Sequence, residues 1–186
     1  MPDKFEVKHL DSNIIIGGFF PDRKDIERDN HRACLNFLNW IYDHELNTKL
    51  RMSLVAYGEV FNKMQTSKDQ RTIHNGYDKF IEYKKNMGKR FEIYSPKLEG
   101  SSEDIDKAIH ILKERDVEIR KSNADALIVA YAMIDNDASS IYTMDNHLLN
   151  GVEIDTAVNM FRKKRSMRSL AIRPVIDHEP MNGALQ

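Results

Sequence analysis

The hydrophobic positions of the chain alternate between short β-type runs and longer stretches with helical spacing. The first β-type run is Phe5–Leu10 (FEVKHL), which is rather polar and ends at Asp11. From Asn30, a reasonable helix cap, apolar positions recur at i, i+3, i+4 and i+7, the spacing of one helix face. These positions are Cys34, Phe37, Leu38 and Ile41.

Lys49–Ser53 (KLRMS) is a second short strand candidate, and it leads directly into another predicted helix. The apolar stripe of that helix consists of Tyr57, Val60, Phe61 and Met64. Residues 63–90 are polar, basic and aromatic, and we interpret them as an irregular or helical insertion. Phe91–Pro96 (FEIYSP) is typical of a short extended segment that ends at the proline.

The second half of the chain contains the clearest helical patterns. Residues 101–116 are predicted to form a helix capped by Ser101 or Ser102, with acids in its first turn, which the helix macrodipole favours. Its apolar stripe is Ile105, Ala108, Ile109 and Leu112. Ala124–Ile134 is apolar nearly all round, which indicates a helix buried between two layers.

Three further β-type runs complete the pattern. Ser139–Thr143 is a short strand bounded by polar residues, Val152–Ile154 is another candidate, and Leu170–Ile176 contains Pro174, which restricts it to a sheet edge. Short strands that alternate with helices favour the α/β class. We therefore predict an α/β/α sandwich with a central, mainly parallel sheet.

Length and composition narrow the picture only slightly. We expect residues 1–155 to form one domain, interrupted by the insertion at about residues 63–90, and residues 156–186 to form a basic extension with a helix and an edge strand. The formal net charge of −1 argues neither for nor against a nucleic-acid partner. The single Cys34 excludes an internal disulfide framework and a cysteine-based zinc site.

The first residues contain no apolar signal core, and no apolar run approaches the length of a transmembrane helix. We therefore expect a cytoplasmic protein that is not associated with a membrane.

Four acids stand where such a fold would bring them together. Asp11 and Asp145 end two predicted strands, Glu59 lies on the helix after the second strand, and Asp125 lies in the first turn of the buried helix. In open α/β sheets, ligands gather outside the carboxyl ends of the strands. Four carboxylates at one place need a counter-charge, and Mg²⁺ or Mn²⁺ prefers such oxygen ligands. Such ions make phosphodiester hydrolysis accessible.

Each acid also has an ordinary structural explanation. Asp125 can compensate a helix dipole, Asp145 can serve as a turn residue, Asp11 can form a local turn with its neighbours, and Glu59 can lie on a solvated helix face. The four positions in this order favour the metal-site interpretation over four separate coincidences.

The sequences around these acids resemble the four acidic motifs of PIN-domain ribonucleases. The motifs are LDSN at residues 10–13, VAYGEVF at 55–61, NADALIVAYAM at 123–133 and SSIYTMD at 139–145. The resemblance spans roughly Phe5–Asp155 and includes the D-x-N opening, the D-A-L-I helix start and the T-x-D after the late strand. It implies a PIN-like fold and a metal-dependent endoribonuclease.

Carried over by motif, the resemblance assigns metal binding and catalysis to Asp11, Glu59, Asp125 and Asp145. It also implies that Asn13 and Thr143 support the acids or the phosphate. The expected cofactor is Mg²⁺ or Mn²⁺, and the expected substrate is RNA, preferentially single-stranded.

Many members of this family are VapC-like toxins of toxin–antitoxin pairs, and others process ribosomal or messenger RNA. Residues 17–30, the insertion at 63–90 and the tail beyond Asp155 depart from the short toxin pattern. An antitoxin or another protein partner, and a homodimer, therefore stay open.

Two basic segments with interleaved aromatics, Tyr83–Phe91 and Phe161–Arg173, are candidate RNA contacts. The alternative is that each is simply a solvated face. The candidate residues are Lys84, Lys85, Lys89, Arg90, Arg162, Lys163, Lys164 and Arg165.

Two other functions are consistent with parts of the pattern. A PIN-like domain could act as a non-catalytic scaffold that binds RNA or protein, although all four acids are present. A haloacid-dehalogenase-like phosphatase would need D-x-D after the first strand, where this chain has Asp11-Ser12-Asn13. A receiver domain would need paired acids before that strand and a lysine after a late strand, and the sequence offers neither.

Overall fold

The computed structural model describes residues 5–177 apart from 23–25, 27–28, 67–69 and 97. Within this part of the chain, five strands form one parallel sheet in the order β3-β2-β1-β4-β5. The strands are β1 (Glu6–Leu10), β2 (Thr48–Ser53), β3 (Phe91–Tyr94), β4 (Ala138–Thr143) and β5 (Ala171–Pro174). The predicted parallel sheet is confirmed.

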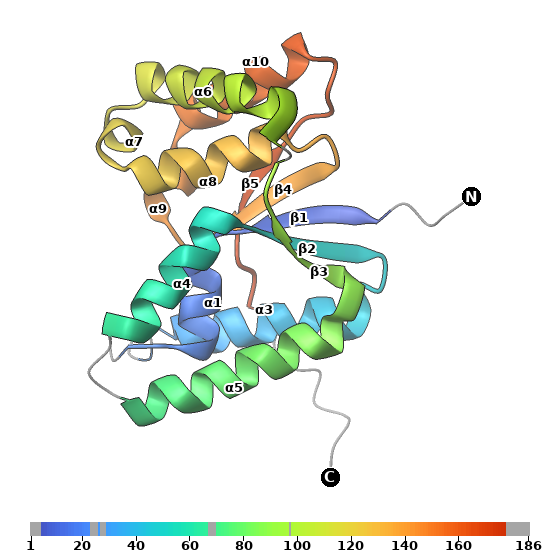
Figure 1. Ribbon diagram of the computed structural model, residues 1–186, viewed down its shortest axis with the longest axis vertical. Helices are drawn as coiled ribbons and strands as arrows, with labels where there is room; N and C mark the ends of the chain where they lie inside the picture. The colour runs from blue at the N-terminus through green and yellow to red at the C-terminus, as the bar shows by residue number, and fades with distance from the viewer. Residues whose placement is uncertain (1–4, 23–25, 27–28, 67–69, 97, 178–186) are drawn as a thin grey trace.

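One face of the sheet is covered by helices from the first half of the chain (Figure 1). They are α1 (Ser12–Phe19), α3 (Asn30–His44), α4 (Leu54–Thr66) and α5 (Gln70–Met87), which the 3-10 helix η1 (Gly88–Arg90) follows. The buried residues of α3 are Cys34, Phe37, Leu38 and Ile41, the stripe that the sequence predicts. Together with buried side chains of α1, α4, α5 and the sheet, they form one hydrophobic core.

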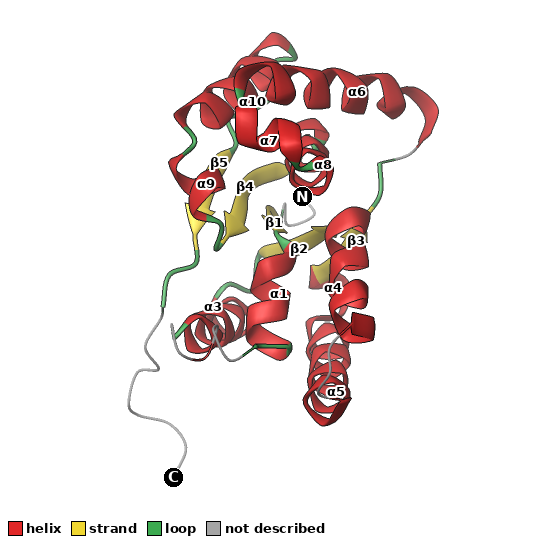
Figure 2. Ribbon diagram, turned by 90° about the vertical axis from the view of Figure 1, so that its left-hand side faces the viewer, coloured by secondary structure: helices red, strands yellow, loops and turns green. Residues whose placement is uncertain are grey.

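The opposite face is covered by helices from the second half, and Figure 2 shows the resulting three layers. They are α6 (Leu98–Arg115), α7 (Val117–Lys121), α8 (Asn123–Ile134) and α10 (Val152–Lys164), with α9 (Asn146–Asn150) between β4 and α10. Their apolar residues form a second core, to which α8 contributes Ala126, Val129, Ala130, Ala132 and Met133. The architecture is the predicted α/β/α sandwich, and it is consistent with a PIN-like fold.

Several local predictions need correction. Val152–Ile154 is not a strand but the first turn of α10, because Ile154, Ala157, Val158 and Phe161 form a buried helical stripe. The cap position of α3 is occupied by Asp29 rather than Asn30. Helix α6 begins before the predicted serine caps, at Leu98. The insertion is mostly regular, since α5 takes up 18 of its residues.

The segment from α10 to β5 is part of the same sheet and core. Residue 155 lies inside α10, whose Ile154 and Phe161 are fully buried. Strand β5 pairs with β4 at the edge of the sheet, and Pro174 is its last residue, as the proline predicts. Residues 156–174 therefore do not form a separate unit. Among the described residues, no helix combines the length and apolar character needed to cross a membrane.

The strand order determines where a ligand site belongs. The chain leaves β1 toward β2 and β3 on one side and continues with β4 and β5 on the other, so the order reverses between β1 and β4. At such a point the connections diverge and leave a crevice outside the carboxyl ends of the strands. Asp11 follows β1 and Met144 follows β4, so both lie at this point.

Candidate functional site

Asp11 is the centre of the polar groups at the carboxyl ends of β1 and β4. Its side chain is buried, with 4% of the residue exposed. The Thr143 hydroxyl and the Asn13 amide each donate a hydrogen bond of 2.7 Å to Asp11 Oδ2. The Ser12 hydroxyl lies 3.3 Å from Asp11 Oδ1. Asp11 is therefore held from both sides of the switch point.

Asn13 and Thr143, the predicted supporting residues, join the start of α1 to the end of β4. The Asn13 amide donates to Thr143 Oγ1 at 3.1 Å, and its Oδ1 accepts from the backbone N–H of Met144 at 3.0 Å. Thr143 Oγ1 in turn accepts from the backbone N–H of Asp145 at 2.9 Å. These bonds fix the backbone on which two of the acids stand.

Glu59 reaches the same place from α4. The Ser12 hydroxyl donates to Glu59 Oε2 at 2.5 Å, while it also lies against Asp11. One hydroxyl therefore stands between two carboxylates. Sequence reasoning did not single out Ser12, because a serine after an aspartate is indistinguishable from a turn residue until the partner helix is placed.

Asp125 and Asp145 approach from the other layer and from the end of β4. Asp125 lies in the first turn of α8, where its backbone N–H bonds to the capping hydroxyl of Ser122. Its charge acts on Asp11. Asp145 caps α9 by accepting from the backbone N–H groups of His147 and Leu148, so its carboxylate points toward that helix.

The electrostatics of this site are unbalanced. Burial raises the pKa of Asp11, the hydrogen bond from Thr143 opposes this, and the charges of Glu59 and Asp125 raise it further, to about 6. Among the described residues, no Lys, Arg or His forms an ion pair with any of the four acids. The structure thus places Glu59 and Asp125 near enough to Asp11 for their charges to act on it, whereas the Asp145 carboxylate caps α9.

The donor chemistry of this site suits a hard divalent cation, although the acids do not form a closed cage. No three carboxylate, imidazole or thiol groups of the described chain stand close enough to bind one ion together. Mg²⁺ commonly uses only one or two carboxylates and retains several waters. A buried carboxyl with a raised pKa beside like charges is the kind of ligand that gains most from such an ion.

The C-terminal basic segment is not an RNA surface as a whole. Arg162 is fully buried, and its guanidinium donates to the backbone carbonyls of Ala132, Met133, Asp135 and Ala138. The expectation that Arg162 contacts RNA is therefore wrong, because its donors satisfy the end of α8 and the start of β4. Arg165 pairs with Asp104, whereas Lys163 and Lys164 are exposed.

The other basic segment is also partly occupied by structural contacts. Lys84 Nζ lies 4.9 Å from the centre of the Tyr57 ring, and Arg90 donates to the backbone carbonyls at the end of α3. Lys85 and Lys89 are exposed. Basic residues in the last turn of a helix stabilise its negative end, and both segments end a helix, α5 or α10.

The candidate RNA-binding residues of both basic segments lie at the end of the sheet opposite to the acids. Helices α5 and α10 end where β3 and β5 begin, at the amino ends of the strands on the right of Figure 1. The acids lie at the carboxyl ends, on the left. Since α10 has 13 residues, it is about 20 Å long.

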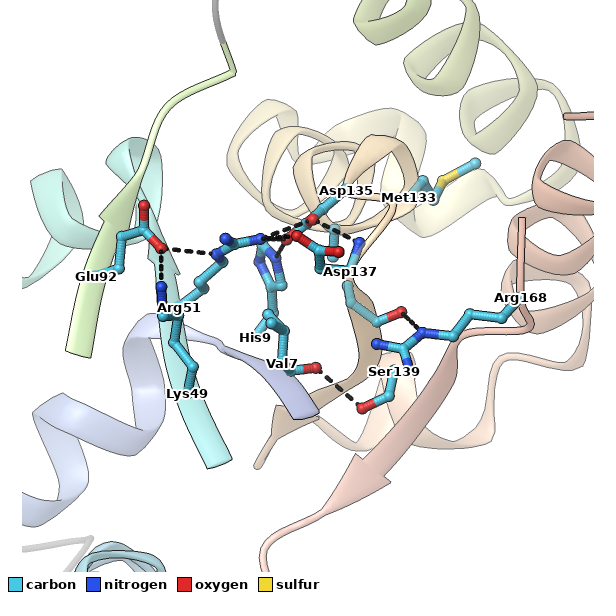
Figure 3. A network of polar contacts seen from close by, with 12 residues as sticks. Val7, His9, Lys49, Arg51, Glu92, Met133, Asp135, Asp137, Ser139 and Arg168 are labelled. Carbon is cyan, nitrogen blue, oxygen red and sulfur yellow. Dashed lines mark hydrogen bonds and ion pairs between the residues drawn. The ribbon is translucent and has the colours of Figure 1, made fainter. Parts of the chain in front are cut away.

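A second polar cluster lies between the sheet and the far end of α8, and Figure 3 shows its contacts. Arg51 donates two bonds to Asp135 at 2.7 and 2.8 Å and one to Glu92 at 2.9 Å. His9 Nε2 lies 2.7 Å from Asp135. Burial raises the pKa of Asp135, but the bonds from His9 and Arg51 outweigh it and hold the value at about 2. We call His9, Arg51, Glu92 and Asp135 the Asp135 cluster.

Comparison with known proteins adds little to this description. No family model matches the chain, and no curated protein matches it. A search of solved structures finds VapBC2 from Rickettsia felis bound to a DNA fragment from their promoter, at 16% sequence identity and a TM-score of 0.49. The match covers 90% of this chain and 98% of the other. A similarity of this size carries no information on activity.

Proposed function

We propose that the protein is a Mg²⁺- or Mn²⁺-dependent endoribonuclease that hydrolyses phosphodiester bonds of single-stranded RNA. One observation carries the proposal. A buried aspartate at the topological switch point, with its pKa raised to about 6, faces two further carboxylates without a described cationic partner. Charges of one sign persist in a fold when a ligand of the opposite sign compensates them. The resemblance to PIN-domain motifs points to RNA as the substrate.

Among Asp11, Glu59, Asp125 and Asp145, one or two would bind the ion directly, and the others would contact it through its waters. When bound, it would supply a water of lowered pKa and neutralise charge on the phosphate. The chain itself would keep Asp11 ionised and oriented through Thr143 and Asn13, and would hold Glu59 in place through Ser12. In-line attack of water on phosphorus would then leave 5′-phosphate and 3′-hydroxyl ends, as the family resemblance implies.

The alternative is a non-catalytic PIN-like scaffold that binds RNA or protein. Its support is that three of the four acids already accept hydrogen bonds within the chain. Asp11 accepts from Thr143 and Asn13, Glu59 from Ser12, and Asp145 from the N-terminus of α9. For either function, an antitoxin or another protein partner, or a second copy of the chain, stays part of the proposal.

The test is cleavage of an unstructured, fluorescently labelled RNA by purified protein with Mn²⁺. Asp125→Asn should lower the cleavage rate by more than about 100-fold, which exceeds the usual loss for residues that merely orient a metal ligand. Asp106→Asn, an exposed acid on α6, is the matched control and should retain full activity.

Wild-type protein that binds Mn²⁺ but cuts no RNA would favour the scaffold. Equal cleavage by wild type and Asp125→Asn, or cleavage in excess chelator, would refute the proposed site.

A further inference from the structure

A nuclease with an acidic centre needs positive charge near that centre to hold the phosphates of its substrate. The two basic segments predicted from sequence end helices at the amino ends of the strands, away from the acids. Other cations must serve if the proposed function holds. The short helix α7 and the last turn of α6 provide them at the carboxyl ends of the strands.

Helix α7 is attached to two of the four acids. At its start, Asp116 accepts a 2.8 Å hydrogen bond from the ring of His147, whose backbone N–H donates to Asp145 at 2.6 Å. At its end, Lys121 directly precedes Ser122, which caps the turn that contains Asp125. The helix therefore lies at the rim of the acidic site, between Asp145 and Asp125.

The cations on this segment are available. The Arg120 side chain is exposed and donates through Nε to the backbone carbonyl of Lys113, which leaves its terminal N–H groups without a carboxylate partner among the described residues. Lys113 Nζ donates only to the neutral amide of Asn123. Lys121 pairs with Glu118, but both side chains are largely exposed, so the pair contributes little and can open.

The remaining charges of the segment do not cancel these cations. Glu114 lies beside His110, and Arg115 lies 3.6 Å from Glu153 on α10. Glu118 is the partner of Lys121. Lys113 and Arg120 thus stay uncompensated at the edge of a site that is otherwise negative.

We propose that Lys113, Arg120 and Lys121, the α7 basic surface, bind the backbone phosphates of the RNA that enters the acidic site. This inference rests on the proposed function and names the surface that its substrate uses. Lys121 is four residues from Asp125, so the two Cα atoms are at most about 14 Å apart. The Lys121 side chain can therefore reach a phosphate next to the phosphate that is cleaved.

The experiment compares two double variants that remove the same charge. Arg120→Gln with Lys121→Gln alters the α7 basic surface, and Lys163→Gln with Lys164→Gln alters the exposed end of α10. Binding of an unstructured RNA is measured by fluorescence anisotropy in chelator, where no cleavage occurs, at several salt concentrations. The first variant should bind at least about tenfold more weakly, with a salt slope reduced by about 1.4, corresponding to two lost phosphate contacts.

The α10 variant should keep the wild-type affinity and slope. An unchanged slope for the α7 variant, or a reduced slope for the α10 variant, would overturn the inference, as would absence of RNA binding by wild type. The single variant Lys121→Gln, at a largely exposed side chain, guards against misfolding and should lower the slope by about 0.7. If the α7 variant has a reduced salt slope but the wild type cuts no RNA, the proposed nuclease function is refuted and the RNA-binding role of the α7 basic surface is supported.

Discussion

The two ends of helix α8 place buried carboxylates in opposite electrostatic settings. At the first turn, Asp125 faces Asp11, whose pKa rises to about 6. At the C-terminal end, about 15 Å from Asp125, Asp135 lies against Arg51 and His9, and its pKa falls to about 2. Both sites are buried against the same sheet, so burial alone does not distinguish them.

The difference lies in the counter-charge. The Asp135 cluster is complete within the chain, because each carboxylate has a cationic or imidazole partner and the network needs nothing from outside. The acidic site contains hydroxyl and amide donors but no described cation. The first arrangement is suited to holding the layers together, and the second is suited to binding.

The largest expected effect is on the complete cluster. Asp135→Asn should lower the free energy of unfolding by about 3–5 kcal/mol, because it leaves the buried Arg51 with an incomplete partner. Urea denaturation followed by circular dichroism measures the change. Asp106→Asn, exposed on α6, should stay within about 0.5 kcal/mol of wild type, and a similar value for Asp135→Asn would mean that the cluster is not structural.

The pH dependence of stability should have opposite signs at the two ends. Asp11 keeps its proton to about pH 6 when folded but loses it near 3.8 when unfolded, so its effect is to lower stability as the pH rises between these values. Asp11→Asn should remove this loss, which is worth about 3 kcal/mol in metal-free protein. Asp135 contributes stability above pH 3.8 that is lost as the pH falls through 2.

Urea unfolding at pH 4.5 and 7.5 in chelator, for wild type and Asp11→Asn, tests the first sign. If the free energies of unfolding of the two proteins differed by the same amount at both pH values, the pKa of Asp11 would not be raised in the folded protein.

Added Mn²⁺ should stabilise the protein through the acidic site at the first turn of α8 and not through the Asp135 cluster. Mn²⁺ at about a hundred times its dissociation constant should stabilise wild type by about 2.7 kcal/mol. It should have little effect on Asp125→Asn, because that variant lacks a ligand charge. Thermal unfolding with and without Mn²⁺ measures this, and equal stabilisation of both proteins would place the ion elsewhere.

The smallest effect concerns the hydroxyl between Asp11 and Glu59. Ser12→Ala should weaken Mn²⁺ binding by about tenfold, since residues that orient metal ligands have effects of this order. Ser12→Thr retains a hydroxyl and should recover most of the affinity. Titration calorimetry at pH 7 measures both, and equal affinities for Ala and Thr would show that the hydroxyl has no positioning role.

The sequence predicted the layers well, because amphipathic spacing and strand length report burial directly. The stripe of α3, the apolar helix α8 and the edge position of Pro174 were confirmed. Helix α1 was not predicted, because its Ile14–Ile16 run and paired glycines lack helical periodicity, although α3 and the sheet bury it.

A residue of the site could be predicted only where its sequence context fixes its position in the fold. Asp11 follows from the end of a parallel strand, Asn13 and Thr143 follow from the motif resemblance, and the structure places the three in contact. The basic segments were harder, because a sequence does not say at which end of the sheet a helix stops. Arg162 was wrongly assigned to an RNA surface for a different reason. A buried guanidinium that donates to backbone carbonyls is indistinguishable in sequence from an exposed one.

The buried Arg162 also constrains how the chain can fold during synthesis. Four of its five carbonyl acceptors follow Asp125 in sequence but precede α10, and β4 stays an open edge until β5 pairs with it. A nascent chain that has emerged only as far as Asp155 therefore carries every acid of the site without the interactions that close the sheet. We therefore expect the acidic site to reach its final arrangement late, after residue 174 has left the exit tunnel of the ribosome.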